Sequence, residues 1–197
     1  MPFMLLTTDA IVLSLQPCSD KAHLLHAYTR AGGRVNYKVY GIGRKHPIGL
    51  YTPLSLIQLT ASCPPNGVPT LKEATLLPAS LPLSPFISDP YKRTIALFVS
   101  EVLYHVLRHP MADEPMFDFL VQAVQELDKT EEPQNFHLQF LVSFAAKLGF
   151  AMPEEIPLPR TRVERQEQLK QLCAYFSEHV DSWSEPRSLP VLKEVFD

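Results

Sequence analysis

The segment GGRVNYKVYGIGRKH, from Gly32 to His46, combines two patterns. Between residues 34 and 40 polar and apolar side chains alternate, which is typical of a β-strand with one face on a core. Val35, Tyr37 and Val39 are therefore predicted to point inward. The second half of the segment is a short loop with two glycines, and it ends in Arg44, Lys45 and His46.

Four further segments near this strand have strand-like composition and are separated by glycine and proline residues. They are residues 9–15, 22–29, 54–60 and 70–77. Five short strands within about eighty residues, with no long helical period among them, are typical of a small closed barrel such as the OB-fold. We therefore expect a five-stranded OB-fold barrel for nucleic-acid binding over residues 1–80.

The hydrophobic period changes from 2 to 3.6 after a proline-rich passage. This passage contains Pro78, Pro82, Pro85 and Pro90. We expect a linker over residues 81–90 and an α-helical domain over residues 91–197, with the first helix starting at Asp89-Pro90. The predicted fold class is α+β with two domains, an N-terminal OB-fold barrel followed by an α-helical bundle.

The charge of the chain is divided unevenly between its two parts, and the formal net charge of −3 conceals this. Residues 1–80 contain seven Lys and Arg against three Asp and Glu, a net charge of +4. Residues 81–197 contain eleven against eighteen, a net charge of −7. Such an asymmetry indicates that the N-terminal domain meets an anionic partner.

The outward face of the strand at residues 34–40 is the candidate binding surface. It presents Arg34, Lys38 and Tyr40, a combination of cations and an aromatic ring that suits the phosphates and bases of a nucleic acid. The two glycines that follow permit close approach of the backbone to a ligand. Alternating charge on a half-exposed strand is usually just a solvated face, but the charge excess of residues 1–80 favours a ligand.

Other kinds of chemistry find less support. Cys18, Cys63 and Cys173 lie far apart and form no C-x-x-C pair, so we expect reduced thiols, no metal and no cofactor. Cys18 with His23 and His26 nearby suggests a nucleophile and a base, but no third group is placed to orient them. An enzyme therefore ranks last among the functions considered. No segment has the length of a membrane span or the basic start of a signal peptide, so we expect an intracellular protein.

The segment SDKAHLLHAYTRAGGRVNYKVYGIGR, from Ser19 to Arg44, resembles the RecO family of bacterial recombination mediators. The shared features are Ser-Asp-Lys before a strand, Thr-Arg at its end, Gly-Arg at the start of the next strand, and a basic turn that begins with glycine. Here they are Ser19–Lys21, Thr29–Arg30, Gly33–Arg34 and Gly41–Arg44. The similarity continues weakly through KLGF at 147–150 and RSLPVLKEVF at 187–196, and it covers nearly the whole chain.

The resemblance implies an OB-fold followed by a helical domain, binding of single- and double-stranded DNA, strand annealing, and a place in the RecF pathway of DNA repair. There RecO works with RecR to load RecA onto strands covered by single-stranded-DNA-binding protein. It also implies a bacterial cytoplasmic protein associated with the nucleoid. Many members hold zinc with four cysteines after the helix that matches residues 147–150. Those cysteines are absent here and the segment 151–160 is short, so no metal is expected.

The sequence thus predicts a non-enzymatic DNA-binding mediator. The predicted nucleic-acid-binding residues are Lys21, Arg30, Arg34, Lys38, Tyr40, Arg44, Lys45 and His46. Four of them also match the family's motifs, namely Lys21, Arg30, Arg34 and Arg44, whereas the others rest on the pattern of the strand and loop alone. The alternative is a protein-interaction adaptor whose helical groove binds a partner peptide and whose barrel is only a scaffold.

Overall fold

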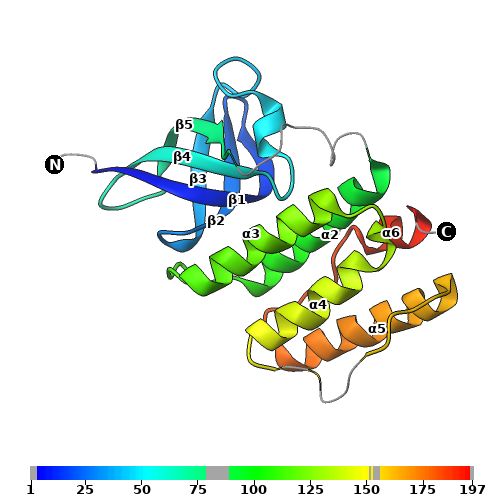
Figure 1. Cartoon of the computed structure of the whole chain (residues 1–197). Coiled ribbons are helices and arrows are strands. Elements are labelled where there is room, and N and C mark those ends of the chain that lie inside the picture. The colour runs from blue at the N-terminus through cyan, green and yellow to red at the C-terminus, as the bar shows by residue number, and fades with distance from the viewer. Residues whose placement is uncertain (1–3, 79–88, 151, 153–155, 196–197) are drawn as a thin grey trace. The chain divides into compact units, whose positions relative to one another are not determined.

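The computed structural model describes residues 4–78, 89–150, 152 and 156–195. Its first part consists of the strands β1 (Met4–Ser19), β2 (Ala22–Thr29), β3 (Gly33–Tyr40), β4 (Leu56–Cys63) and β5 (Thr70–Leu76), with a short 3-10 helix η1 (Ile48–Tyr51). The strands close into a barrel in the order β1-β2-β3-β5-β4 (Figure 1). Among the described strands, β3 and β5 pair in parallel, and the other neighbouring strands pair in antiparallel fashion. This is the order of the OB-fold, so the predicted fold of the first part is confirmed.

Strand β1 closes the ring because it pairs with both β4 and β2. Its first part, Met4–Ile11, pairs with β4, and its second part, from Ala10 to Ser19, pairs with β2. A register shift between Val12 and Ser14 interrupts the second ladder, and such irregularities bend a strand. The sequence indicated only the middle of this strand, residues 9–15, because the apolar alternation is clear only there.

Inward side chains from all five strands fill the barrel core. Tyr37 is 1% exposed and Val39 is completely buried, as the alternation in β3 predicted. The same core includes Leu25 and Ala27 from β2, Ile57 and Leu59 from β4, Leu71 from β5, and Tyr51 from η1. Each large apolar side chain that leaves water contributes about 1.5–3 kcal/mol, so this core is the main source of the barrel's stability.

The internal packing divides the chain into two compact units. The first comprises residues 1–84 and 107–125, and the second comprises residues 85–106 and 126–197. Helix α3 (Glu114–Lys129) therefore has most of its length in the barrel unit. The predicted linker, residues 81–90, lies outside the described residues apart from Asp89 and Pro90, and the predicted domain boundaries stay predictions.

The second unit is built from helices. They are α2 (Pro90–Val106), α4 (Phe136–Lys147), α5 (Arg162–His179) and α6 (Leu189–Val195), with a 3-10 turn η2 (Pro133–Asn135). Helix α2 begins where Asp89-Pro90 predicted it, because Asp89 Oδ1 accepts a hydrogen bond from the Tyr91 backbone N–H at 2.8 Å. Helix α5 begins with a capping box formed by Thr161 and Glu164.

Aromatic side chains hold the helices of the second unit together. The Phe144 ring of α4 stacks on Phe140, with ring centroids 5.4 Å apart, and on Phe176 of α5 at 6.1 Å. Helix α6 is fastened to α2 because Glu101 Oε2 accepts hydrogen bonds from the Ser188 backbone N–H and hydroxyl, at 2.9 and 2.6 Å. The predicted helical bundle is thus confirmed. Within the described part of the chain, no helix combines the length and apolar character needed to span a membrane.

Candidate nucleic-acid interface

The β2–β3 hairpin separates the predicted site residues into two groups. Ala22 pairs with Tyr40 at one end of the hairpin, and Thr29 pairs with Gly33 at the other. Because an extended strand rises about 3.3 Å per residue, these ends lie roughly 20 Å apart. A single cradle formed by all eight residues would therefore have to span the whole length of the hairpin.

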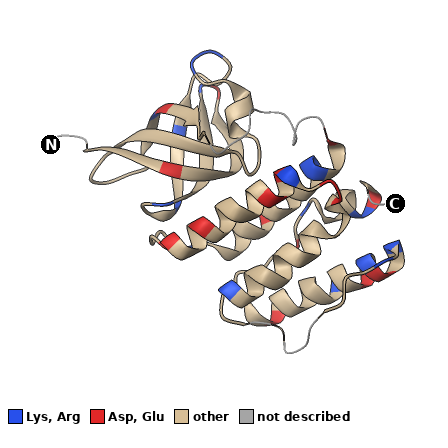
Figure 2. Cartoon of the chain, in the orientation of Figure 1, with Lys and Arg blue, Asp and Glu red and all other residues tan. Residues whose placement is uncertain are grey.

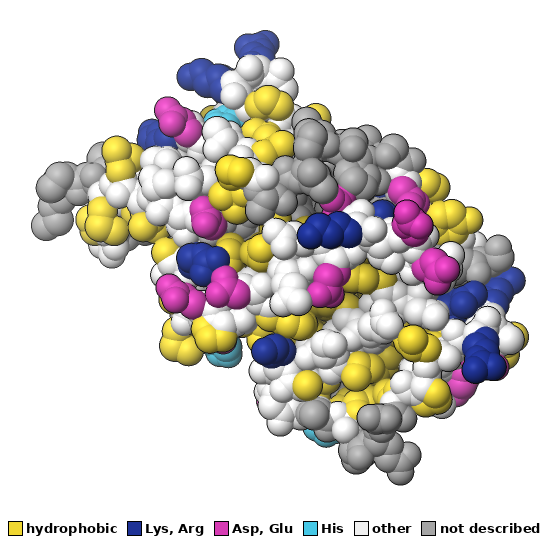
Figure 3. Space-filling model, in the orientation of Figure 1, with side chains coloured by type: hydrophobic (Ala, Val, Ile, Leu, Met, Phe, Trp, Pro, Cys, Tyr) yellow, Lys and Arg dark blue, Asp and Glu magenta, His cyan; other side chains and the backbone are white. Residues whose placement is uncertain are grey.

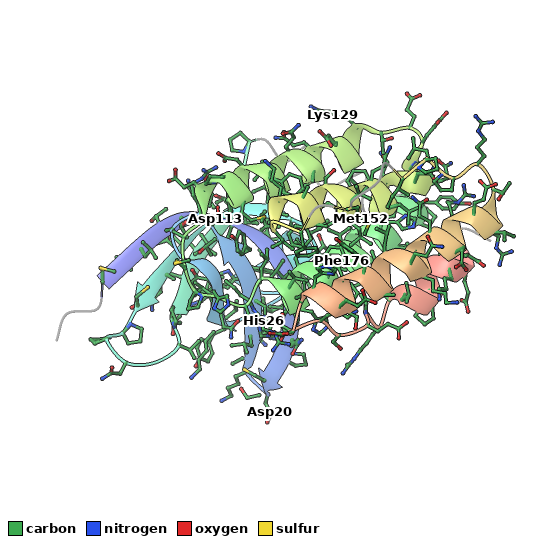
Figure 4. The ribbon with its side chains drawn as sticks, turned by 90° about the horizontal axis from the view of Figure 1, so that it is seen from below. Asp20, His26, Asp113, Lys129, Met152 and Phe176 are labelled. Atoms are coloured by element: carbon green, nitrogen blue, oxygen red, sulfur yellow. The ribbon has the colours of Figure 1, made fainter. Side chains whose placement is uncertain are left out.

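Most of the exposed cations gather at the Tyr40 end. Lys21 is exposed in the turn between β1 and β2, whose tip is marked by Asp20 in Figure 4. Arg44 and Lys45 are exposed in the loop that follows β3, and Figure 2 shows positive charge on this projecting loop. Tyr40 is 49% exposed, so one edge or face of its ring is open to a base.

Lys72 of β5 joins this group, although sequence reasoning missed it. Lys38 lies beside Thr70 where β3 and β5 run parallel, and continuing this register along both strands would bring Lys72 next to Tyr40. The signal was present in TLKEATLL, where Leu71 points into the core and Lys72 is exposed. What the sequence did not indicate is that β5 lies beside β3. We name the cationic end as the set Lys21, Lys38, Tyr40, Arg44, Lys45 and Lys72.

Arg30 lies at the other end of the hairpin, where its guanidinium is paired with carboxylates of the same unit. Its Nη2 donates to Asp118 Oδ1 of α3 at 2.7 Å, and its Nε lies 3.9 Å from Asp9 Oδ2. The guanidinium carbon sits 4.5 Å from the centroid of the Phe117 ring. Two carboxylates and an aromatic face thus neutralise and position this cation inside the first unit. We therefore leave Arg30 out of the interface proposed below.

The neighbouring turn is shaped by backbone contacts with the segment that precedes α3. Gly33 has φ +61°, and a Cβ atom there would lie 2.3 Å from the Met111 carbonyl oxygen. The Arg34 backbone N–H donates to the His109 carbonyl at 3.3 Å. The Arg34 side chain is half-buried and belongs to this end. The Thr-Arg and Gly-Arg motifs therefore build the place where residues 107–125 pack on the barrel.

His46 is buried, at 6% exposure, against Tyr51 of η1. Its Nδ1 is 2.9 Å from the Tyr51 hydroxyl oxygen. Burial, assisted by the charge of Lys45, lowers the pKa of His46 below its ordinary value, so the imidazole is neutral near pH 7. A buried neutral ring does not contact phosphate, so His46 is also left out of the proposed interface.

The cationic end is well suited to a polyanion. Its five Lys and Arg side chains are exposed, and they come from β3, β5 and two adjacent loops of the same barrel. Asp20 and Glu73 are the neighbouring carboxylates in sequence, so the net charge stays positive. Figure 3 shows cationic side chains projecting at this end of the barrel. The set can neutralise phosphates and offer one ring for stacking.

Cys18 and His26, which the sequence suggested as a nucleophile and a base, each have another hydrogen-bond partner in the structure. Cys18 is exposed, while His26 is buried and its Nδ1 is 2.7 Å from Asn36 Oδ1. Burial lowers the pKa of His26 below its ordinary value. Among the described residues, no group of three or more His, Cys, Asp or Glu side chains is arranged to hold a metal ion.

Comparison with known proteins agrees with this architecture. Residues 87–154 match the family model described as "Recombination protein O C terminal". The DNA repair protein RecO of Flavobacterium johnsoniae is 28% identical over 239 residues, which cover 98% of this chain and 100% of that protein. RecO of Porphyromonas gingivalis is 32% identical over 153 residues, covering 74% of this chain and 61% of that protein. RecO of Phocaeicola vulgatus is 34% identical over 151 residues, with the same shares.

The fold and the exposed charges define an OB-fold protein with an attached helical domain and a cationic barrel end. The comparisons give the particular family: the chain belongs to the RecO family of DNA repair proteins. Membership assigns it a role in DNA repair and recombination.

Proposed function

We propose that this protein is a non-enzymatic recombination mediator that binds single- and double-stranded DNA through the cationic end of its barrel. One observation supports the proposal: Lys38 is exposed near the end of β3 and Arg44 and Lys45 are exposed in the loop that follows it, whereas Arg30 is held by Asp118. Membership of the RecO family supports a role in DNA repair, and the exposed cations support this choice of binding surface.

The mechanism is neutralisation of backbone phosphates. The five Lys and Arg side chains of the cationic end displace the counterions of the strand, and this release of ions drives binding. For a single strand, about five neutralised phosphates give a slope of log affinity against log salt of roughly −3 to −4. Two complementary strands held on such surfaces repel each other less, which promotes annealing. Because phosphates are the same at every base, no sequence preference is expected.

The resemblance to RecO also supports a set of partners. We propose that the protein acts with RecR in the RecF pathway to load RecA onto strands coated by single-stranded-DNA-binding protein, in the bacterial cytoplasm near the nucleoid. The barrel's cationic end would be occupied by DNA in these steps. The faces that meet the protein partners lie elsewhere on the molecule in this proposal.

A fluorescence titration with a short labelled oligonucleotide at several salt concentrations tests the proposal. Replacing Lys38, Arg44 and Lys45 by Gln should weaken binding at low salt and reduce the slope by about 2, since each lost contact removes about 0.7 for single strands. A charge-matched control replaces Lys129, Lys170 and Arg187, which are exposed in the second unit, by Gln. Equal affinities and slopes for the two triple variants would refute the site.

The alternative function, an adaptor that binds a peptide, has one observation in its favour. A groove in the second unit is lined by residues of α5 and of the segment before it, and Leu158 and Val163 are exposed there, at 55% and 75%. Replacing Val163 by Asp would then abolish partner capture and leave DNA binding intact. The cationic end favours the DNA-binding function, because a scaffold barrel needs no such charge.

A further inference from the structure

The loop that carries Arg44 and Lys45 is folded tightly on itself. The Gly41 carbonyl accepts hydrogen bonds from the backbone N–H groups of Arg44 at 3.1 Å and Lys45 at 2.9 Å. Gly43 donates to the His46 carbonyl at 2.9 Å. Gly41 and Gly43 have φ +78° and +82°, a conformation that other residues rarely adopt. We name residues 41–46 the basic loop.

Two side chains of the basic loop point inward. Ile42 packs against the barrel core, and His46 is buried with its Nδ1 2.9 Å from the Tyr51 hydroxyl. The His46 and Tyr51 rings meet edge to face, with centroids 6.1 Å apart. Tyr51 is itself 4% exposed and belongs to the core. The loop is thus attached to the core on one side and presents its cations on the other.

We infer that the buried His46–Tyr51 pair is the internal anchor that holds Arg44 and Lys45 in position to bind phosphate. His46 is then a positioning residue, not a phosphate contact. This inference rests on the proposed function and deepens it. The physical reason is that a loop which is already ordered loses less conformational entropy when DNA binds.

The protonation states favour the hydrogen bond at neutral pH. Burial raises the pKa of Tyr51 to about 12, so its hydroxyl keeps its proton. Burial lowers the pKa of His46, and the nearby charge of Lys45 lowers it further. The neutral imidazole therefore accepts a hydrogen bond from the Tyr51 hydroxyl at Nδ1 when its own proton is on Nε2. Substituting His46 or Tyr51 near pH 7.5 changes the anchor without changing the net charge of the barrel.

Tyr51→Phe removes one hydroxyl and tests the anchor without DNA. Trypsin cleaves after Arg and Lys, so its rate of cleavage after Arg44 and Lys45 reports opening of the basic loop. We expect this rate, measured by mass spectrometry, to rise about three- to tenfold, the range that corresponds to loss of one hydrogen bond. Tyr37→Phe is the matched control, since Tyr37 is buried in the same core but takes no part in the hydrogen bonds described above for the basic loop.

His46 is tested by two substitutions. His46→Leu should open the loop as Tyr51→Phe does. His46→Asn should keep the cleavage rate close to the native one, because the Asn side-chain oxygen can accept the Tyr51 hydrogen bond in place of Nδ1. If His46→Leu and Tyr51→Phe both fold and their loops are cleaved at the native rate, the anchor is refuted.

DNA affinity separates positioning from general destabilisation. Tyr51→Phe should weaken oligonucleotide binding about three- to tenfold at low salt. In a background with Arg44 and Lys45 both replaced by Gln, the same change should have no effect. An equal loss in both backgrounds, or no loss in the native one, would overturn the inference. If the Arg44 and Lys45 replacements alone leave DNA affinity unchanged, the proposed function fails at this loop, and the cleavage rates still decide whether the anchor exists.

Discussion

The guanidinium of Arg30 lies 2.7 Å from the carboxylate of Asp118, although 88 residues separate them in sequence. The same guanidinium rests 4.5 Å above the ring of Phe117, the residue before Asp118. The Tyr28 ring of β2 stacks on Phe117 from the barrel, with centroids 6.4 Å apart. These contacts attach α3 to the barrel, so we expect Arg30 to stabilise the first unit and not to bind DNA.

We expect Arg30→Gln to destabilise the protein by about 1–2 kcal/mol, since it removes a partly exposed ion pair and a cation–π contact. Urea unfolding measures this, and a cycle with Asp118→Asn should give a coupling energy of about 0.5–1 kcal/mol. Lys38→Gln, a change at an exposed strand position, should alter stability by no more than about 0.5 kcal/mol. In DNA titrations the roles reverse: Lys38→Gln weakens binding and Arg30→Gln does not. The opposite pattern would return Arg30 to the interface.

Gly33 and Gly43 both have positive φ, but only Gly33 is crowded. A Cβ atom at Gly33 would lie 2.3 Å from the Met111 carbonyl oxygen and 2.8 Å from that of His109, whereas nothing lies within 4 Å at Gly43. We expect Gly33→Ala to cost about 3 kcal/mol or more and Gly43→Ala about 1 kcal/mol, the latter from backbone strain alone. Thermal unfolding of the two variants checks the difference, and equal shifts would contradict the close approach.

His137 makes stability depend on pH. It is 3% exposed, its ring meets Phe98 edge to face, and burial together with the charge of Arg165 lowers its pKa to about 3. The unfolded chain therefore binds a proton near pH 6.5 that the folded chain does not bind until about pH 3, so stability falls as pH decreases through this window. His137 alone should contribute a loss of up to about 2 kcal/mol between pH 6.5 and 5.

Urea unfolding at these two pH values measures the effect. His137→Phe, which keeps a ring in the same place, should reduce the difference in unfolding free energy between pH 6.5 and pH 5. The other buried histidines, His26 and His46, remain in the variant, and their pKa values are lowered too, so part of the pH dependence persists. An unchanged difference would mean that the pKa of His137 in the folded protein is close to its ordinary value.

Lys72 provides a test of the parallel β3–β5 register. Lys72→Gln should reduce the salt slope of single-strand binding by about 0.7, the value of one phosphate contact. Lys170→Gln removes an exposed cation from α5 of the second unit and should leave the slope unchanged. If the salt slope of Lys72→Gln equals that of the native protein, DNA does not contact β5, and the interface consists of β3 and the loops.

Local patterns in the sequence were enough to predict several of the elements, although they indicated only the middle of β1. The alternation in β3 predicted that Tyr37 and Val39 are buried, and Asp89-Pro90 predicted the start of α2. The reason is that side-chain period and helix capping depend on residues only a few positions apart. The resemblance to RecO rested on motifs in one hairpin, and it was confirmed by comparisons that cover most of the chain.

Only the tertiary structure decided which cations are exposed to a ligand. In sequence, Arg30 and Arg44 are equivalent arginines beside glycine-rich turns, but folding brings Asp118 from α3 to Arg30 and leaves Arg44 exposed. His46 follows two cations in the sequence, yet the closed barrel buries it against Tyr51. Charge neutralisation and burial depend on partners distant in the chain, and these partners meet only when the core has formed.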